Sequence, residues 1–286
     1  MTTENFFCGT SGLVLPVPNK QAFPEAYRAG TRLTYYASLF SSLEVNSSFY
    51  KIPKAATFAR WVDEVPEHFR FTVKLWRGIT HVPSLAFEPA DVTRFMEAAA
   101  GLGAKKGCLL IQLPPSAKAI RAKELEALLA TIRRSEESTG APASPRRVAQ
   151  WKLAVEFRDK SWYTAATDQL LQRFNAIRVL QDMPTSFNWH PAQGSSLIYM
   201  RYHGIAGDYR GGYPEERLKQ DATIIKTALQ AGKEVYAYFN NTIGDAVANA
   251  QFLAGALFPV TQQPAKHDQL ADMITGMIDD QQRLPE

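Results

Sequence analysis

Eight short segments rich in β-branched, aromatic and leucine residues recur along this chain of 286 residues, and stretches long enough for helices separate most of them. This alternation is typical of βα units, whose strands pair in parallel. Eight strands are the number that closes a (β/α)8 barrel, and such barrels reach about 250 residues as one domain. The sequence therefore predicts an α/β fold made of a single (β/α)8 TIM-like barrel. The predicted strands are 6–10, 43–49, 69–75, 107–113, 152–158, 177–182, 197–203 and 234–240.

Helical patterns fill the stretches between the strands. Pro89 and Pro214 stand where two of the helices begin, and Gly101 and Gly232 stand where the same two end, as is common for these residues. The predicted helices are 30–40, 55–63, 88–102, 120–137, 163–174, 214–231 and 244–257, with a last one near 267–280. We expect one domain over 1–286, with a surface excursion at 135–150 and a C-terminal extension at 258–286.

The composition limits the class of protein. Hydrophobic residues make up 45% of the chain and charged residues 21%, as in ordinary globular proteins. The formal charge of +4 is a mild excess that neither requires nor excludes a nucleic-acid partner. Cys8 and Cys108 show no metal-site spacing, and the chain has neither a signal-peptide pattern nor an apolar run approaching a membrane span. We therefore expect a cytoplasmic protein with no membrane contact, and the sequence does not fix its oligomeric state.

Many polar side chains are predicted to point into the barrel. Alternate residues of a barrel strand face the helices and the interior, so we assign the more apolar set of each strand to the helices. Buried charges without partners are costly, so this polar set must pair internally or meet a ligand. In (β/α)8 barrels, sites lie at the carboxyl ends of the strands. The inward polar residues near those ends are Glu44, Asn46, Lys74, Gln112, Glu156, Arg158, Asp182, Arg201, His203, Tyr238 and Asn240.

These residues allow a functional interpretation and a structural one. Arginine and lysine would hold an anionic group, and carboxylates beside cations can serve as acid and base. The predicted ligand-binding residues are Asn46, Lys74, Gln112, Arg158, Arg201, Tyr238 and Asn240, and the predicted catalytic residues are Glu44, Glu156, Asp182 and His203. Alternatively, the charged members form a salt-bridge network that closes the barrel without catalysis, and His203 is a core histidine.

Several motifs, in this order, resemble those of one family. They are GTSG at 9–12, LEVNSSFY at 43–50, FRFTVK at 69–74, ITH at 79–81, QLPP at 112–115, AVEFRDKSW at 154–162, YMRYHG at 199–204 and YAYFNN at 236–241. Together they resemble the YecE-like family, which is domain of unknown function 72. The resemblance implies a TIM-like barrel and no established activity. This chain departs from the family pattern at 13–20 and has a longer stretch at 138–150.

Three functions remain open on these residues. The first is a hydrolase or lyase acting on an anionic or phosphate-bearing small molecule, with no cofactor. The second is a nucleic-acid-binding or endonuclease-like barrel, in which Glu156, Asp182, His203 and His81 would share a divalent ion. Neighbouring cations would repel that ion, so we expect no metal. The third is a non-catalytic ligand-binding module that uses the same residues.

Overall fold

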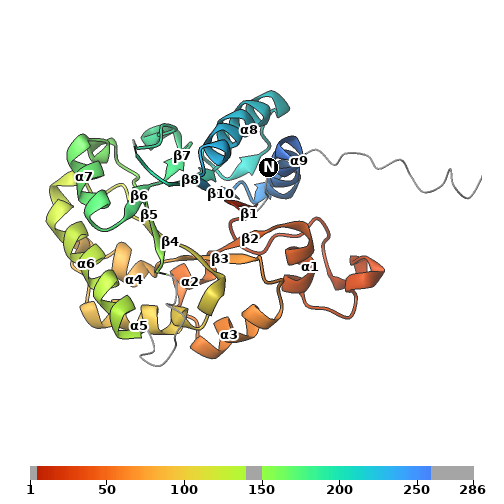
Figure 1. The fold of residues 1–286 in the computed structure, drawn as a ribbon, viewed down its shortest axis with the longest axis horizontal. Coiled ribbons are helices and arrows are strands. Elements are labelled where there is room, and N and C mark those ends of the chain that lie inside the picture. The colour runs from red at the N-terminus through yellow and green to blue at the C-terminus, as the bar shows by residue number, and fades with distance from the viewer. Residues whose placement is uncertain (1–4, 140–149, 193, 259–286) are drawn as a thin grey trace, which may run out of the picture.

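The structure is a computed structural model that describes residues 5–139, 150–192 and 194–258. Its main strands form two parallel sheets (Figure 1). One sheet has the order β2-β3-β4-β5-β6 and the other the order β1-β10-β8-β7. The strands are β1 (Phe6–Thr10), β2 (Ser42–Val45), β3 (Arg70–Lys74), β4 (Lys106–Gln112), β5 (Lys152–Glu156), β6 (Ala176–Arg178), β7 (Leu180–Gln181), β8 (Leu197–Tyr202) and β10 (Glu234–Phe239).

The two sheets meet at two places. Val179 alone separates β6 from β7, and its backbone N–H donates to Val155 of β5 at 2.9 Å. On the other side, β1 and β2 are joined by an isolated parallel bridge between Ser11 and Glu44. These observations confirm an α/β fold with parallel sheets. The hydrogen-bonded ladders nevertheless form two sheets, so the closed barrel predicted from the sequence is not confirmed.

Helices cover the outer faces of both sheets (Figure 1). The predicted helices within the described residues are all present, with ends shifted by a few residues at most. They are α1 (Arg32–Leu39), α3 (Ala55–Asp63), α5 (Pro89–Ala100), α6 (Ala122–Thr139), α7 (Ala165–Arg173), α8 (Glu215–Gln230) and α9 (Ala246–Leu257). Two single turns, α2 (Ser47–Tyr50) and α4 (Arg77–Thr80), and the short strands β9 (Arg210–Gly211) and β11 (Ile243–Gly244) were not predicted.

Several predicted segments differ in the structure, and one of them is the strand predicted at 177–182, which is interrupted at Val179 and forms β6 and β7. The strand predicted at 43–49 ends at Val45, because Asn46 takes a helical conformation (φ −78°, ψ −23°) and α2 follows it. The excursion predicted at 135–150 begins later, since α6 continues to Thr139, and residues 140–149 lie outside the described residues. The helix predicted near 267–280 also lies outside them, as does the rest of 259–286.

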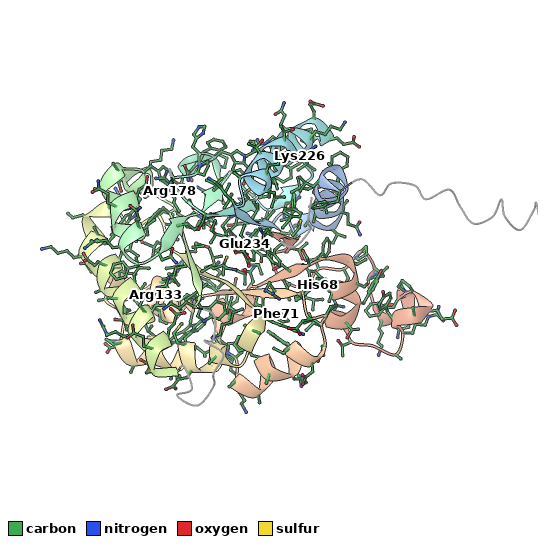
Figure 2. All side chains as sticks on the ribbon, in the orientation of Figure 1. His68, Phe71, Arg133, Arg178, Lys226 and Glu234 are labelled. Atoms are coloured by element: carbon green, nitrogen blue, oxygen red, sulfur yellow. The ribbon has the colours of Figure 1, made fainter. Side chains whose placement is uncertain are left out.

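The core has two parts, as the strand alternation requires. The larger part lies between strands and helices and includes Leu43, Val45, Phe71 and Val73. The smaller part lies on the opposite strand faces and draws side chains from both sheets, namely Phe7, Cys108, Leu110, Ala154, Val179, Leu197, Tyr199, Tyr236 and Tyr238. The inner faces of the two sheets are therefore packed against each other, and side chains fill the space between the ribbons (Figure 2).

Candidate functional site

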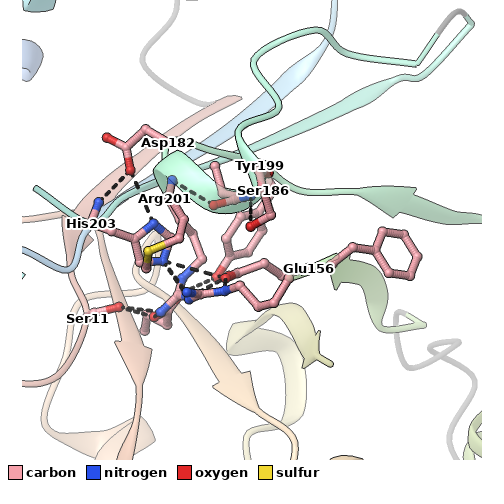
Figure 3. Close-up of polar contacts among 12 residues, drawn as sticks. Ser11, Glu156, Asp182, Ser186, Tyr199, Arg201 and His203 are labelled. Atoms are coloured by element: carbon pink, nitrogen blue, oxygen red, sulfur yellow. Dashed lines mark hydrogen bonds and ion pairs between the residues drawn. The ribbon is translucent and has the colours of Figure 1, made fainter. Parts of the chain in front are cut away.

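Arg201, near the carboxyl end of β8, is the centre of a buried ionic network (Figure 3). Its Nε and Nη2 donate to the two carboxylate oxygens of Glu44 at 2.9 and 2.7 Å, and Nη2 also donates to Ser11 Oγ at 3.1 Å. Nη1 donates to Glu156 and lies 3.2 Å from Nε2 of His203. All five N–H groups of a guanidinium thus have an acceptor within the protein. Arg201, whose exposed fraction is 0%, has no donor left for the ligand-binding role predicted for it.

The carboxylates of Glu44 and Glu156 are also fully engaged. Ser11 and Tyr199 donate to Glu44 in addition to Arg201, and Arg158 donates its Nε–H to Glu156. Burial alone would raise the pKa of Glu156, but the positive charges of Arg158 and Arg201 outweigh burial and hold that pKa below its ordinary value. Glu156 is therefore ionised at neutral pH. Its two oxygens are already occupied, which leaves little room for the catalytic acid or base predicted for it.

His203 links this network to Asp182. Its Nδ1 lies 3.2 Å from Oδ1 of Asp182, and its backbone N–H donates to the same oxygen at 2.7 Å. Tyr213 donates its hydroxyl to the other oxygen of Asp182 at 2.5 Å. Burial lowers the pKa of His203, so the ring is neutral. We therefore assign a proton to Nδ1, which donates to Asp182, and leave Nε2 to accept from Arg158 at 3.0 Å and from Arg201.

Arg158 and Lys74 differ from Arg201 because they keep unused donors. Arg158 uses Nε and one N–H of Nη2, and its Nη1 has no acceptor among the described residues. Lys74 lies at the end of β3, and its Nζ has neither an ion-pair nor a hydrogen-bond partner among the residues that the structure describes. This Nζ lies 4.0 Å from the centre of the Phe49 ring. The exposed fractions are 9% for Lys74 and 8% for the Arg158 side chain. Both cations therefore sit at the edge of the network with part of their hydrogen-bonding capacity free.

The charge around Lys74 makes its amine unusual. Burial first, and then the positive charges of Arg201 and Arg158, lower the pKa of Lys74 to about 8 against the opposing charges of Glu156 and Glu44. His81 lies beside the same cations. Burial first, and then the charges of Lys74, Arg77 and Arg158, lower the pKa of His81 to about 4. The imidazole of His81 is therefore neutral at neutral pH.

The remaining predicted ligand-binding residues occupy different depths. Asn46, Gln112 and Asn240 are partly exposed at the ends of β2, β4 and β10, and Oδ1 of Asn46 is buried without a hydrogen-bond partner. Tyr238 lies deeper, because its hydroxyl bonds to Ser42 at 2.5 Å and to Thr72 at 2.8 Å, below the level of Glu44. Tyr238 thus packs inside the strands, away from the partly exposed residues.

Three members of the network were not among the predicted site residues. Tyr199 is on the predicted inward face of its strand, two residues before Arg201, so the alternation could have included it. Ser11 belongs to the GTSG motif, which had no assigned role. Tyr213 follows β9 in a connecting segment, where strand alternation gives no signal.

A metal site and a membrane span are not found in the described residues. No group of three or more His, Cys, Asp or Glu side chains there is arranged to hold a metal ion. Among the helices of the same residues, none is both long and apolar enough to cross a membrane.

Three cavities among the described residues lie apart from the ionic network. One of about 590 Å³ is lined by residues that follow β2 and β3, including Tyr50, Lys51 and Trp76. Two others, of about 640 and 500 Å³, are lined by residues at the opposite ends of the strands, including Lys152 and Phe6. Residues of the network line none of these three cavities.

Comparisons with known proteins all point to one protein family. The family model described as "Protein of unknown function DUF72" matches residues 7–271. Two curated bacterial proteins are similar over shorter stretches. UPF0759 protein YecE of Escherichia coli K12 is 33% identical, and the alignment covers 32% of this chain and 34% of YecE. UPF0759 protein YunF of Bacillus subtilis 168 is 38% identical, and the alignment covers 20% of this chain and 21% of YunF. The alignments thus span about a third of the first relative and a fifth of the second.

Two solved structures are similar over most of the chain. The crystal structure of a DUF72 family protein from Enterococcus faecalis V583 has a TM-score of 0.65 and 26% identity, covering 80% of this chain and 94% of that one. The crystal structure of a DUF72 family protein from Thermotoga maritima MSB8 has a TM-score of 0.64 and 26% identity, covering 88% and 98%.

Proposed function

Because this chain belongs to the DUF72 family, whose function is unknown, we propose a function from the site itself: the protein binds a small anionic molecule at the carboxyl ends of its strands and acts on it as a hydrolase or lyase. The proposal treats the two parallel sheets as the two halves of one (β/α)8 barrel. It is supported by the shared inner core and by the Ser11–Glu44 bridge between β1 and β2.

The observation that carries the proposal is the pair of nearly buried cations with unused donors. Arg201 is saturated by Glu44 and Glu156, whereas Lys74 and Arg158 have N–H groups that the described residues do not satisfy. Neither of these donor atoms is among the fully buried polar atoms without a partner, so each remains accessible, and an anion binding there would form charge-assisted hydrogen bonds with both. Phosphate and carboxylate groups match the free edge of the Arg158 guanidinium. The neutral His81 and the amides of Asn46, Gln112 and Asn240 would supply further hydrogen bonds.

Apart from Arg158, the members of the ionic network support the site without contacting the ligand. Glu156 accepts from Arg158 and Asp182 accepts from His203, so these two acids fix Arg158 and His203 in position, while Glu44 fixes Arg201. We therefore assign Glu44 and Arg201 a positioning role. The cytoplasm remains the proposed location, and it is consistent with the two free, buried thiols of Cys8 and Cys108.

Calorimetric titration with inorganic phosphate and with small carboxylates tests the proposal. Wild-type protein should bind at least one of these anions, and Lys74→Met should weaken that binding at least about tenfold, or about 1.4 kcal/mol. Lys219→Met is the matched control, because Lys219 is an exposed lysine of α8 whose one ion-pair partner among the described residues is Glu215, at 3.6 Å. Equal affinity in the wild type and Lys74→Met would contradict the proposal.

A further inference from the structure

We infer that Lys74 is a nucleophile that forms a covalent iminium with an anionic ligand bearing an aldehyde or ketone group. The inference rests on the proposed function and names its substrate class, a carbonyl compound with a carboxylate or phosphate. It also favours the lyase over the hydrolase, because an iminium draws electrons from the neighbouring carbon and so eases the breaking of a bond there.

The first support is that no acid pairs with the amine. A lysine paired with a carboxylate keeps its proton and cannot attack a carbonyl. Two carboxylates lie close enough to act on Lys74, Glu44 and Glu156, but both are bound by Arg201, and Glu156 also by Arg158. Lys74 Nζ is left against the Phe49 ring, 4.0 Å from its centre. This cation–π contact by itself favours the charged form, but burial and the positive charge of Arg201 outweigh it and lower the pKa of Lys74 to about 8.

The second support is the neighbourhood of cations. The charged groups that act on Lys74 are Arg201 of β8, Arg158 after β5, Glu156 of β5 and Glu44 of β2. His81, which lies after α4 and is acted on by the charge of Lys74, is neutral and so adds no charge beside the amine. The free Nη1 of Arg158 would bind the anionic end of the ligand and bring its carbonyl to the amine. The same cations therefore bind the ligand and keep part of the lysine unprotonated.

The chemical step balances without an oxidant or reductant. The lone pair of the neutral amine attacks the carbonyl carbon, a C–N bond forms, and the carbonyl oxygen takes up a proton. The C–O bond then breaks and the oxygen leaves as water, which gives the protonated iminium. In total, one amine, one carbonyl and one proton from solvent give one iminium and one water. Addition of water reverses the step and restores the lysine.

Reductive trapping with glyoxylate tests the inference. The full-length protein is incubated with glyoxylate and sodium cyanoborohydride at about pH 8, and adducts are located by peptide mass spectrometry. At that pH about half of an amine with a pKa near 8 is neutral, against less than about 1% of an ordinary lysine. We expect Lys74 to be modified at least about tenfold faster than Lys219 in the same molecules. We also expect acetaldehyde, which lacks an anionic group, to show a smaller preference for Lys74.

Two variants separate the possible outcomes. Lys74→Arg keeps the positive charge and removes the nucleophile, so the variant should still bind inorganic phosphate. It should give no adduct at position 74, and no other lysine in it should react faster with glyoxylate than it does in the wild type. If wild-type Lys74 reacts no faster than Lys219 while phosphate or a carboxylate binds, the nucleophile is overturned and the anion site stands. If no anion binds and Lys74 shows no preference for glyoxylate over acetaldehyde, the proposed function falls as well.

Discussion

Lys74 and Arg201 carry the same charge in the same cluster, yet their surroundings differ completely. Every N–H of Arg201 has an acceptor, whereas the amine of Lys74 has none among the described residues and contacts an aromatic ring. The difference follows from geometry, because a planar guanidinium can join Glu44 and Glu156 at once and a single ammonium cannot. A buried cation without a partner lowers stability, and such a residue is often retained for function.

The stability of Lys74→Met tests whether the amine of Lys74 destabilises the folded chain. The lowered pKa of Lys74 means that protonating it costs more in the folded chain than in the unfolded chain, whose lysine pKa is about 10.4. Replacing it with methionine should therefore raise the free energy of unfolding by about 1–3 kcal/mol at neutral pH. The gain should shrink as pH rises from about 8 to 10.4, because in that range the folded wild type has lost a proton that the unfolded chain still binds, and it should vanish above about 10.4, where both are neutral. Urea unfolding at two pH values measures this. A less stable variant would show that the amine has a favourable partner.

Two histidines predict how stability depends on acid. The folded-state pKa of His81 is about 4 and that of His203 is also lowered, both chiefly by burial. Between about pH 6.5 and 4 these histidines become protonated in the unfolded chain but stay neutral in the folded chain. The free energy of unfolding should therefore fall as pH falls. The lowered pKa of Glu156 causes a further loss of unfolding free energy, but only below about pH 4.5.

Urea unfolding at about pH 7 and 5 isolates the histidines. The free energy of unfolding should fall between pH 7 and 5 in both proteins, and the fall should be smaller in His81→Gln. Because His81 is partly exposed, we expect the difference to be only about 1 kcal/mol. An NMR titration gives the direct measurement. A His81 ring that becomes protonated near pH 6.5 would refute the assigned environment.

Among the elements, the contact between β1 and β2 joins the two sheets. Gly9 of β1 lies so close to β2 that a Cβ on it would be 1.9 Å from the carbonyl oxygen of Ser42 and 2.5 Å from the Tyr36 hydroxyl. The backbone N–H of Gly12 also donates to Glu44 at 2.8 Å. A side chain at position 9 would therefore push the strands apart.

Gly9→Ala should accordingly cost at least about 3 kcal/mol of unfolding free energy, because neither backbone can move without breaking the pairing of β1 with β10. Gly255→Ala in α9 is the control. Nothing lies within 4 Å of a Cβ there, so alanine should be neutral or stabilise the helix by up to about 1 kcal/mol. Chemical denaturation of both variants decides the point, and equal stabilities would show that β1 and β2 are not in contact.

The elements were predictable to the extent that local patterns determine them. The period of apolar residues located every main strand and the helices of the described residues, and β1 and α3 have the predicted ends. The strand predicted to reach residue 49 failed, because Ser48 donates to the backbone of Val45 and Lys74 and so favours a turn over an extended chain. Alternation continued through LEVNSSF although the strand had already ended.

For the molecule as a whole, the sequence could place charged residues on inner faces but could not choose their partners. Arg201 pairs with Glu44, 157 residues away, and with Glu156, 45 residues away. Nothing local distinguishes these acids from Asp182, which binds His203 and Tyr213 instead. The number of free donors on each cation depends on this pairing. The distinction between positioning and ligand-binding residues therefore required the structure.

The same pairing makes Arg201 a tie between the two sheets, since it lies on β8 of one sheet and its acids lie on β2 and β5 of the other. Arg201→Met would leave both buried carboxylates without their shared cation, and we expect a loss of about 3–5 kcal/mol. Neutralising the acids as well, in the triple variant with Glu44→Gln and Glu156→Gln, should recover part of that loss.

Far-UV circular dichroism and tryptophan fluorescence together test this tie. If the sheets unfold as one unit, the two signals should coincide during wild-type denaturation, and in Arg201→Met both should shift to lower denaturant. Trp162 reports beside β5, and Trp189 reports against Tyr202 of β8, so single-tryptophan variants can follow each sheet. A wild-type midpoint retained in Arg201→Met would mean that the network contributes no stability. A transition at Trp189 well before that at Trp162 in the wild type would mean that the two sheets fold independently, and the single barrel proposed here would then be wrong.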